Sequence, residues 1–437
     1  MPTDKTSDEL REEQIVRISR LFTERLRKSY PHSVPTLDDI ERIVQEIGEK
    51  TKQDIQQEIV DSAGTGNVGK CAQCGCGAIM HYKGDAERTI ITLHGALVYS
   101  RAYYWCPSCR KGTHPTDTQL AAIQGQFTAS VRALACRFSS LLPFAKAAKE
   151  LELVCGIYVS PSTMKRIAMQ TGSALVRSWQ IIDKQLALDS EQDAIKSPDR
   201  MQISMDGVMV HAGGRYREVK LGVCYVPSAD GPKDDTYYAT LGNCHDFGKR
   251  VKTLSLRAGE SKCRSVAVVA DGSDWIWKQA GLYYTQRVQI LDFFHASQHL
   301  YSLANIVFGE GDKQVSEWVH ALQKKLREDE IVQVLQEVRK LDCTTTVQKE
   351  EKRKVYTYLH GHQGRMQYKT YESKGYHIGS GVMESSCRWV VQQRMKAPGM
   401  RWSNTGAEHM LFLRTACCSN DYGMVKDAAR RPRTLTA

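Results

Sequence analysis

The sequence has no apolar run approaching the roughly 18 residues that a membrane-spanning helix requires. Its first residues, MPTDKTSDELREEQ, contain no apolar segment resembling a signal peptide. No internal repeat or low-complexity tract is evident. With 41% hydrophobic and 25% charged residues, the chain is neither largely disordered nor a collagen-like or coiled-coil fibre. We therefore expect a soluble, cytoplasmic protein with no membrane partner.

Length and charge narrow the expectation further. The 437 residues suffice for roughly three domains. Sixty Lys and Arg against 49 Asp and Glu give a net charge of +11, which favours a polyanionic partner. The excess is concentrated in residues 385–437, which hold nine basic and three acidic residues. Five of the 14 cysteines lie within residues 71–109, a distribution that favours metal binding over a disulfide scaffold.

Two Cys-x-x-Cys pairs, Cys71/Cys74 and Cys106/Cys109, are separated by 31 residues. Such turns aim two thiolates at one ion, and two of them complete a tetrahedral, structural Zn²⁺ site. Cys76 is a possible substitute for a ligand of the first pair, so two assignments of that pair remain. Ordinary reduced cysteines are the competing interpretation.

Residues 140–172 are compatible with a helix-turn-helix. A small-residue helix is followed by a turn at Gly156, with Ser160 as N-cap and Pro161 at the first helical position of the next helix. An ordinary pair of core helices explains the same pattern.

From residue 201 onward the pattern changes to strands. Residues 201–210, 217–226 and 235–243 read as strands, and SVAVVADG at 265–272 and VQILDFF at 288–294 as buried ones. Helices are expected between and after the last strands, which predicts a mixed sheet with crossover helices. The charged helical residues 312–360 look inserted into this unit, while SEQDAIKSPDR at 190–200 marks a boundary before it.

Three carboxylates occupy positions where catalytic, metal-binding residues are expected. Asp206 lies in the first strand, Asp271 ends a buried strand, and Glu384 begins a helix. Together they can hold two Mg²⁺ (or Mn²⁺) ions for phosphodiester transfer. Taken singly, the two Asp-Gly pairs are turn dipeptides, and Glu384 is an acid favoured by the helix dipole.

Four segments carry a family resemblance: SMDGVMV, VVADGSDWIW, ILDFFHASQHL and GSGVMESSCRWVVQQRMKAPGMRWSNTGAEHMLFLR. Together they resemble a bacterial insertion-sequence transposase of the ISKra type, related to Mutator-like transposases. The resemblance implies an RNase H-like domain whose catalytic triad is Asp206, Asp271 and Glu384, with Glu372 as the residue that could be mistaken for the last. It also implies an Asp-x-x-His element, Asp292 to His295, in which His295 positions or protonates groups around the scissile phosphate.

The resemblance further implies a DNA transposase that cuts its element's ends and joins them to target DNA. Its partners are double-stranded terminal inverted repeats and target DNA, bound by a homodimer or larger assembly at the nucleoid. Two alternatives remain: an RNase H-like nuclease or resolvase that does not join DNA, and a domesticated DNA-binding protein without catalysis.

Basic and aromatic residues downstream of Glu384 are candidates for DNA contact, with a solvated face as the alternative. They are Arg388, Arg394, Lys396, Arg401 and Trp402. His299, one turn after His295, has a metal-ligand spacing but no evident third ligand.

These expectations define an α/β chain in six segments. Residues 1–62 form an N-terminal helical region, 63–118 a zinc-ribbon-like module, 119–198 a helical DNA-binding region, 199–308 the first part of an RNase H-like core, 309–375 a helical insertion, and 376–437 the last core helices with a basic tail.

Overall fold

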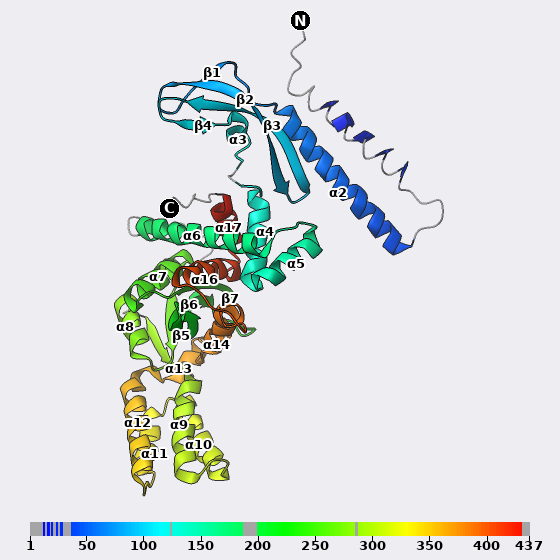
Figure 1. Ribbon diagram of the computed structural model, residues 1–437. Helices are drawn as coiled ribbons and strands as arrows, with labels where there is room; N and C mark the ends of the chain where they lie inside the picture. The colour runs from blue at the N-terminus through cyan, green and yellow to red at the C-terminus, as the bar shows by residue number, and fades with distance from the viewer. Residues whose placement is uncertain are drawn as a thin grey trace. The chain divides into compact units, whose positions relative to one another are not determined.

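The computed structural model describes residues 36–122, 125–186, 199–284 and 287–430, with short helical stretches between residues 12 and 28. The chain divides into two compact units (Figure 1). Most residues up to Met164 belong to the first, and Ser139–Pro143 and Lys165–Ala428 form the second. Most of the predicted boundary at 190–200, and Arg431 and Arg433 of the basic segment, lie outside the described residues.

The first unit contains a four-stranded antiparallel sheet in the order β1-β2-β3-β4. Its strands are β1 (Cys71–Gln73), β2 (Ile79–Thr92), β3 (Gly95–Cys106) and β4 (Lys111–Thr113). Its helices are α2 (Leu37–Ser62), α3 (Pro115–Gln119), most of α4 (Ala129–Leu141) and α5 (Phe144–Cys155). A small core of Met80, Ala102, Tyr104 and Cys106 packs against Cys74 and Cys109. The sheet therefore holds the cysteine-bearing turns on its own core.

The predicted turn between two helices is confirmed. Gly156, with φ +64°, follows α5, and the Ser160 hydroxyl accepts a hydrogen bond from the Thr163 N–H at 3.3 Å. Helix α6 (Pro161–Leu186) then begins at the proline, where the missing N–H has no cost.

The second unit contains a five-stranded sheet in the order β7-β6-β5-β8-β9. Its strands are β5 (Arg200–Ala212), β6 (Arg215–Val226), β7 (Lys233–Thr240), β8 (Ser265–Ala270) and β9 (Val288–Leu291). β5 pairs antiparallel with β6 and parallel with β8. The predicted α/β fold with a mixed sheet is therefore confirmed.

Local sequence explains this topology. The β5–β6 hairpin turns at Gly213 and Gly214, whose φ values of +61° and +79° suit the tight turn that matches strand twist. Helix α7 (Cys244–Arg257) leads into β8, and α8 (Asp274–Tyr283) leads into β9, so each parallel strand follows a helical crossover.

The remaining helices follow β9. They are α9 (Phe293–Phe308), α10 (Lys313–Arg327), α11 (Ile331–Lys340), α12 (Thr346–His362), α13 (Tyr368–Ser373), α14 (Gly381–Ser386), a π-helical turn (Cys387–Gln392), α15 (Gln393–Met395), α16 (Asn404–Cys418) and α17 (Tyr422–Arg430). Helices α9 to α12 lie side by side as a bundle (Figure 1). We call α10 to α13, which follow α9, the helical insertion. None of the helices in the described residues has the length and apolarity of a membrane span.

The two faces of the five-stranded sheet are covered differently. On one face, Gly222 of β6 approaches α7 so closely that an added Cβ would lie 2.6 Å from Val251 Cγ2. On the other, Asp206 contacts Cys387 of the π-helical turn. The sheet therefore presents Asp206 to the segment that carries Glu384.

Candidate functional site

Three aspartates follow one another across adjacent strands. Strands β5 and β8 pair Ser204 with Val269, so Asp206 and Asp271 are each two residues further on. Strands β8 and β9 pair Ala270 with Leu291, which brings Asp292 to the same level. Because neighbouring strands lie about 4.8 Å apart, the three aspartates form a row in which Asp206 lies within β5, while Asp271 and Asp292 directly follow β8 and β9.

Asp206 occupies the middle of the sheet and is half-buried. Its Oδ1 accepts a hydrogen bond from the Gly207 N–H at 2.6 Å, and the Cys387 thiol donates to Oδ2 at 3.4 Å. Burial raises the pKa of Asp206, and the neighbouring negative charge of Asp271 adds to this increase. The carboxylate is thus placed where a cation would stabilise its charged form.

Asp271 is held by the residues that follow it. Its Oδ1 accepts from the Ser273 N–H at 2.9 Å and its Oδ2 from the Ser273 hydroxyl at 3.0 Å. Each oxygen thus accepts one hydrogen bond within this local turn and keeps a lone pair for a further partner.

Asp292 connects two helices. Its Oδ1 accepts from the N–H groups of Phe294 and His295 at the start of α9, and its Oδ2 accepts from the Ser380 N–H at 2.9 Å. The same Oδ2 lies 3.1 Å from His295 Nδ1. Both oxygens are thus occupied by hydrogen bonds, through which Asp292 holds His295 and the entry to α14 in place.

The charges of this row converge on His295, which is half-buried. The hydrogen bond with Asp292 raises the pKa of His295 despite burial, and the negative charges of Asp271 and Asp206 act in the same direction. Burial alone would raise the pKa of Asp292, but its hydrogen bonds with His295 and Ser380 lower it. His295 thus lies beside carboxylates that stabilise its protonated form.

Glu384 lies on α14 and is exposed. Its helix is tied to the row at two points: Ser380 contacts Asp292, and Cys387, one turn after Glu384, contacts Asp206. Glu372, the competing glutamate, instead pairs with Arg327 at 3.1 Å. Sequence reasoning did not find Ser380 and Cys387, although their spacing around Glu384 is a helical one.

The three acids do not enclose a single ion. Among the residues that the structure describes, only the cysteine set below forms a group of three or more metal-ligand side chains whose ligand atoms all lie within 4.8 Å of one another. Ligands on one Mg²⁺ at about 2.1 Å lie at most about 4.2 Å apart. As they stand, Asp206, Asp271 and Glu384 therefore cannot all coordinate one Mg²⁺.

The predicted DNA-contacting residues fall into two groups. Arg388, Lys396 and Arg401 are exposed. Arg394 is fully buried and Trp402 is 9% exposed, so the prediction that these two contact DNA is corrected. The Arg394 Nε donates to the Ser139 carbonyl at 2.8 Å and its guanidinium lies over the Trp402 ring, so both pack the interior.

The metal centre of the first unit consists of Cys74, Cys76, Cys106 and Cys109, which can hold a structural metal such as zinc. The Sγ atoms of Cys74 and Cys109 are 3.6 Å apart, and those of Cys76 and Cys106 are 3.7 Å apart. Four sulfurs at about 2.3 Å from a tetrahedral Zn²⁺ are about 3.8 Å from one another. The cluster therefore has the dimensions of a zinc-thiolate site.

Cys71 is not part of this centre, which corrects the predicted ligand set. It lies in β1 opposite His81, and its Sγ is 3.8 Å from His81 Nδ1. Cys74 and Cys76 instead share the tight turn after β1, where the Cys74 N–H donates to the Ala78 carbonyl at 2.8 Å. Strand pairing thus removes Cys71 and the turn supplies Cys76.

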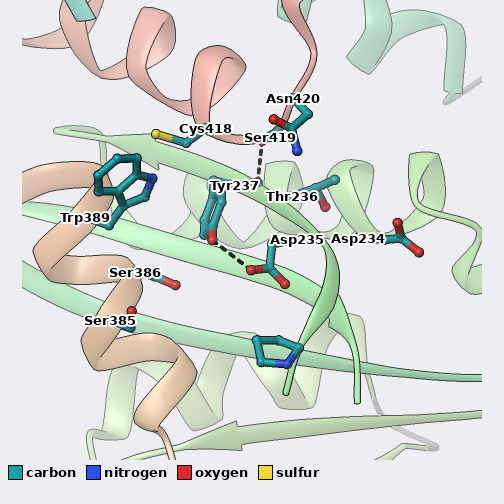
Figure 2. Close-up of a pocket in the computed structure, with 11 residues that line it drawn as sticks. Asp234, Asp235, Thr236, Tyr237, Ser385, Ser386, Trp389, Cys418, Ser419 and Asn420 are labelled. Atoms are coloured by element: carbon teal, nitrogen blue, oxygen red, sulfur yellow. Dashed lines mark hydrogen bonds between the residues drawn. The ribbon is translucent and has the colours of Figure 1, made fainter. Parts of the chain in front are cut away.

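A cavity of about 660 Å³ lies beside the segment that carries Glu384 (Figure 2). Ser385, Ser386 and Trp389 line it from that segment, and Asp234 and Asp235 from the start of β7. The Asp235 carboxylate accepts from the Tyr237 hydroxyl at 3.1 Å, and burial raises the pKa of Asp235. Because the lining residues include two carboxylates and no Lys or Arg, the cavity does not suit a DNA phosphate.

Comparison with protein-family models gave no match for this chain, and a search of curated proteins also gave none.

Proposed function

We propose that the chain is a DNA transposase of an insertion sequence, with an RNase H-like domain formed by the five-stranded sheet of the second unit. The observation that carries the proposal is the strand register that brings Asp206, within β5, level with Asp271, which directly follows the neighbouring parallel strand β8. The tie between Asp206 and the helix of Glu384 adds the third acid. This combination supports metal-assisted phosphodiester transfer.

Asp206, Asp271 and Glu384 are the residues proposed to hold Mg²⁺. In the structure the three carboxylates do not converge on one ion, and two ions shared among them are proposed. Carboxylate oxygens are the ligands that Mg²⁺ prefers. Bound Mg²⁺ supplies activation of the attacking oxygen and stabilisation of the leaving one.

The chain's own residues supply the remaining requirements. His295, held by Asp292, is proposed to donate a hydrogen bond or a proton near the scissile phosphate. Arg388, Lys396 and Arg401 are exposed and proposed to neutralise DNA phosphates. In the first unit, the cysteine centre is proposed to bind Zn²⁺ as a zinc-ribbon module that, with the α5–α6 helices, recognises terminal inverted repeats. Joining two ends requires at least a homodimer.

The test uses the full chain, MgCl₂, a supercoiled target plasmid and linear DNA carrying the sequences that flank the coding region on both sides. We expect cleavage that leaves free 3′ hydroxyl ends and covalent joining of these ends to the plasmid. Asp271→Asn should reduce both rates by more than the roughly 10–100-fold typical of changes outside the metal shell. Asp274→Asn, the same change at an exposed acid in the first turn of α8, serves as the matched control and should keep the wild-type rate.

The alternatives give different results in this assay. Cleavage without joined product indicates a nuclease or resolvase. Specific DNA binding without any cleavage, unchanged by Asp271→Asn, indicates a DNA-binding protein. Either result refutes the transposase proposal.

A further inference from the structure

The helical insertion reaches the acidic row through α12. This helix packs along α9 (Figure 1). Asp292 is the N-cap of α9, and His295 lies in its first turn. The buried side chains of α12 are Val355 and Leu359. Tyr358 lies between these two and extends from α12 to the Asp271–Gly272 turn.

The ring of Tyr358 is clamped by two histidines. It lies against the His299 ring of α9, with centroids 3.9 Å apart and planes at 35°. Its other neighbour, His362, makes an edge contact at 4.9 Å. The ring orientation is therefore fixed by packing from both helices.

Gly272 makes room for this ring. A Cβ at residue 272 would lie 2.1 Å from Tyr358 Cε2 and 2.8 Å from its hydroxyl oxygen. Its backbone φ lies outside the left-handed region, so the need at this position is for space. Tyr358 thus packs directly on the residue that follows Asp271.

The hydroxyl of Tyr358 is buried and makes no hydrogen bond. An unsatisfied buried polar group costs about 1–3 kcal/mol, and such groups are rare in native proteins. Burial, with the negative charges of Asp271 and Asp292, raises the pKa of Tyr358, so the hydroxyl keeps its proton at neutral pH. A donor without an acceptor is therefore held beside a catalytic carboxylate.

In the proposed site, the Asp271 carboxylate is the candidate hydrogen-bond acceptor for this donor. Both of its oxygens now accept from Ser273, and its ligand atoms do not converge with those of Asp206 and Glu384. Each oxygen keeps a lone pair for a further donor or ligand. The Tyr358 hydroxyl is an unused donor at the same turn, and a hydrogen bond from it would hold the carboxylate in the orientation in which it works together with Asp206.

We propose that Tyr358 is a positioning residue for Asp271, whose carboxylate accepts a hydrogen bond from the Tyr358 hydroxyl in the DNA-bound protein. The inference rests on the proposed function, because it assigns Asp271 to the reaction. It also gives the helical insertion a part in the chemistry. A role confined to packing would be served at least as well by phenylalanine, which fills the same space without an unpaired hydroxyl.

The test is Tyr358→Phe, with Tyr356→Phe on the same helix as the matched control. Tyr356 stacks on His360, with centroids 5.7 Å apart. Single-turnover DNA cleavage is measured in MgCl₂ over a range of DNA concentrations, together with the melting temperature. We expect Tyr358→Phe to lower the maximal rate by roughly 10–100-fold, with an unchanged half-saturating DNA concentration and an unchanged or higher melting temperature. Tyr356→Phe should keep the wild-type rate.

A second variant tests the same contact from the other side. Gly272→Ala should displace the Tyr358 ring and lower the rate, and Tyr358→Phe added to it should cause little further loss, since both remove one interaction. The inference is overturned if Tyr358→Phe keeps the wild-type rate, or if it lowers the melting temperature and the rate together. Asp271→Asn separates the two proposals: if it is inactive while Tyr358→Phe is normal, only the inference fails, whereas an active Asp271→Asn refutes the proposed function.

Discussion

At the scale of single residues, Asp292 organises the acidic row although it does not contact substrate in our account. One carboxylate caps α9, orients His295 and holds the Ser380 N–H at the entry to α14. It is fully buried, so each of these hydrogen bonds forms away from water. The geometry of both His295 and Glu384 therefore depends on this side chain.

Asp292→Asn should lower the pKa of His295, because it removes the negative charge that stabilises the imidazolium. The pKa is measured by NMR titration of the imidazole resonances, with His295→Gln assigning the signal. In the folded wild type the raised pKa stabilises the protein fully below about pH 6.5. This contribution is lost as the pH rises through the raised value. An unchanged His295 pKa in the Asp292→Asn variant would contradict this role.

The lowered pKa of Asp292 has the opposite pH dependence. Its contribution is present above the ordinary aspartate pKa and is lost as the pH falls through the lowered folded value. Asp292→Asn should thus reduce the unfolding free energy at neutral pH and flatten its decrease in acid, as measured by urea unfolding.

The sequence identifies the acids but not their partners. Asp206 and Asp271 were predictable because one lies in an apolar strand and the other ends one. The contacts of Cys387 and Tyr358 were not, since they join residues far apart in the chain through packing of the π-helical turn and α12. The burial of Arg394 was not predicted for the same reason. Its neighbours in the sequence suggest an exposed position, but its side chain donates a hydrogen bond to the distant Ser139 carbonyl.

At the scale of elements, the end of the four-stranded sheet that carries the cysteines is expected to depend on metal ligation. Among the residues that the structure describes, the core packed against Cys74 and Cys109 has only four buried members, so zinc ligation is expected to supply much of the stability of this end. Spacing alone predicted Cys71, because two residues separate it from Cys74. The extent of β1, which ends at Gln73, decides the ligand set and cannot be obtained from spacing.

Cys76→Ser should therefore remove the metal, while Cys71→Ser should retain it. Zinc per chain is measured by atomic emission after gel filtration, and the fold of the sheet by circular dichroism with and without a chelator. We expect one zinc in the wild type and in Cys71→Ser, and unfolding of this end of the sheet on chelation. Loss of zinc in Cys71→Ser with retention in Cys76→Ser would reverse our assignment.

The basic residues after Glu384 are of two kinds: Arg394 is buried and structural, whereas exposed residues such as Arg401 are proposed to contact DNA. Arg394→Ala should lower the unfolding free energy by about 2 to 4 kcal/mol, because it removes a buried, hydrogen-bonded guanidinium. Arg401→Ala should leave stability unchanged and weaken DNA binding, with the slope of log K against log salt reduced by about 0.9. Thermal unfolding and fluorescence anisotropy at several salt concentrations check both. Equal effects of the two variants on stability would contradict the division.

At the scale of the whole molecule, the net positive charge and the mixed sheet both support the proposal of an enzyme that acts on DNA. A net charge of +11 favours a polyanion, and the sheet order β7-β6-β5-β8-β9 makes the parallel strands that lead to Asp206 and Asp271 neighbours. Strand and helix positions in residues 201–308 were predictable from periodicity, because each element has a clear apolar pattern. The crossover rules determine the order of the strands only in part, and α16, from much later in the chain, packs against the edge strand β7.

The central claim is that Asp206, Asp271 and Glu384 share two divalent ions. Anomalous diffraction from crystals of the full chain soaked in MnCl₂ tests it most directly. We predict two manganese peaks about 3.5–4 Å apart, between Asp206 and Asp271 and on the side of Glu384. Manganese peaks elsewhere in the chain with none at these carboxylates would contradict the account.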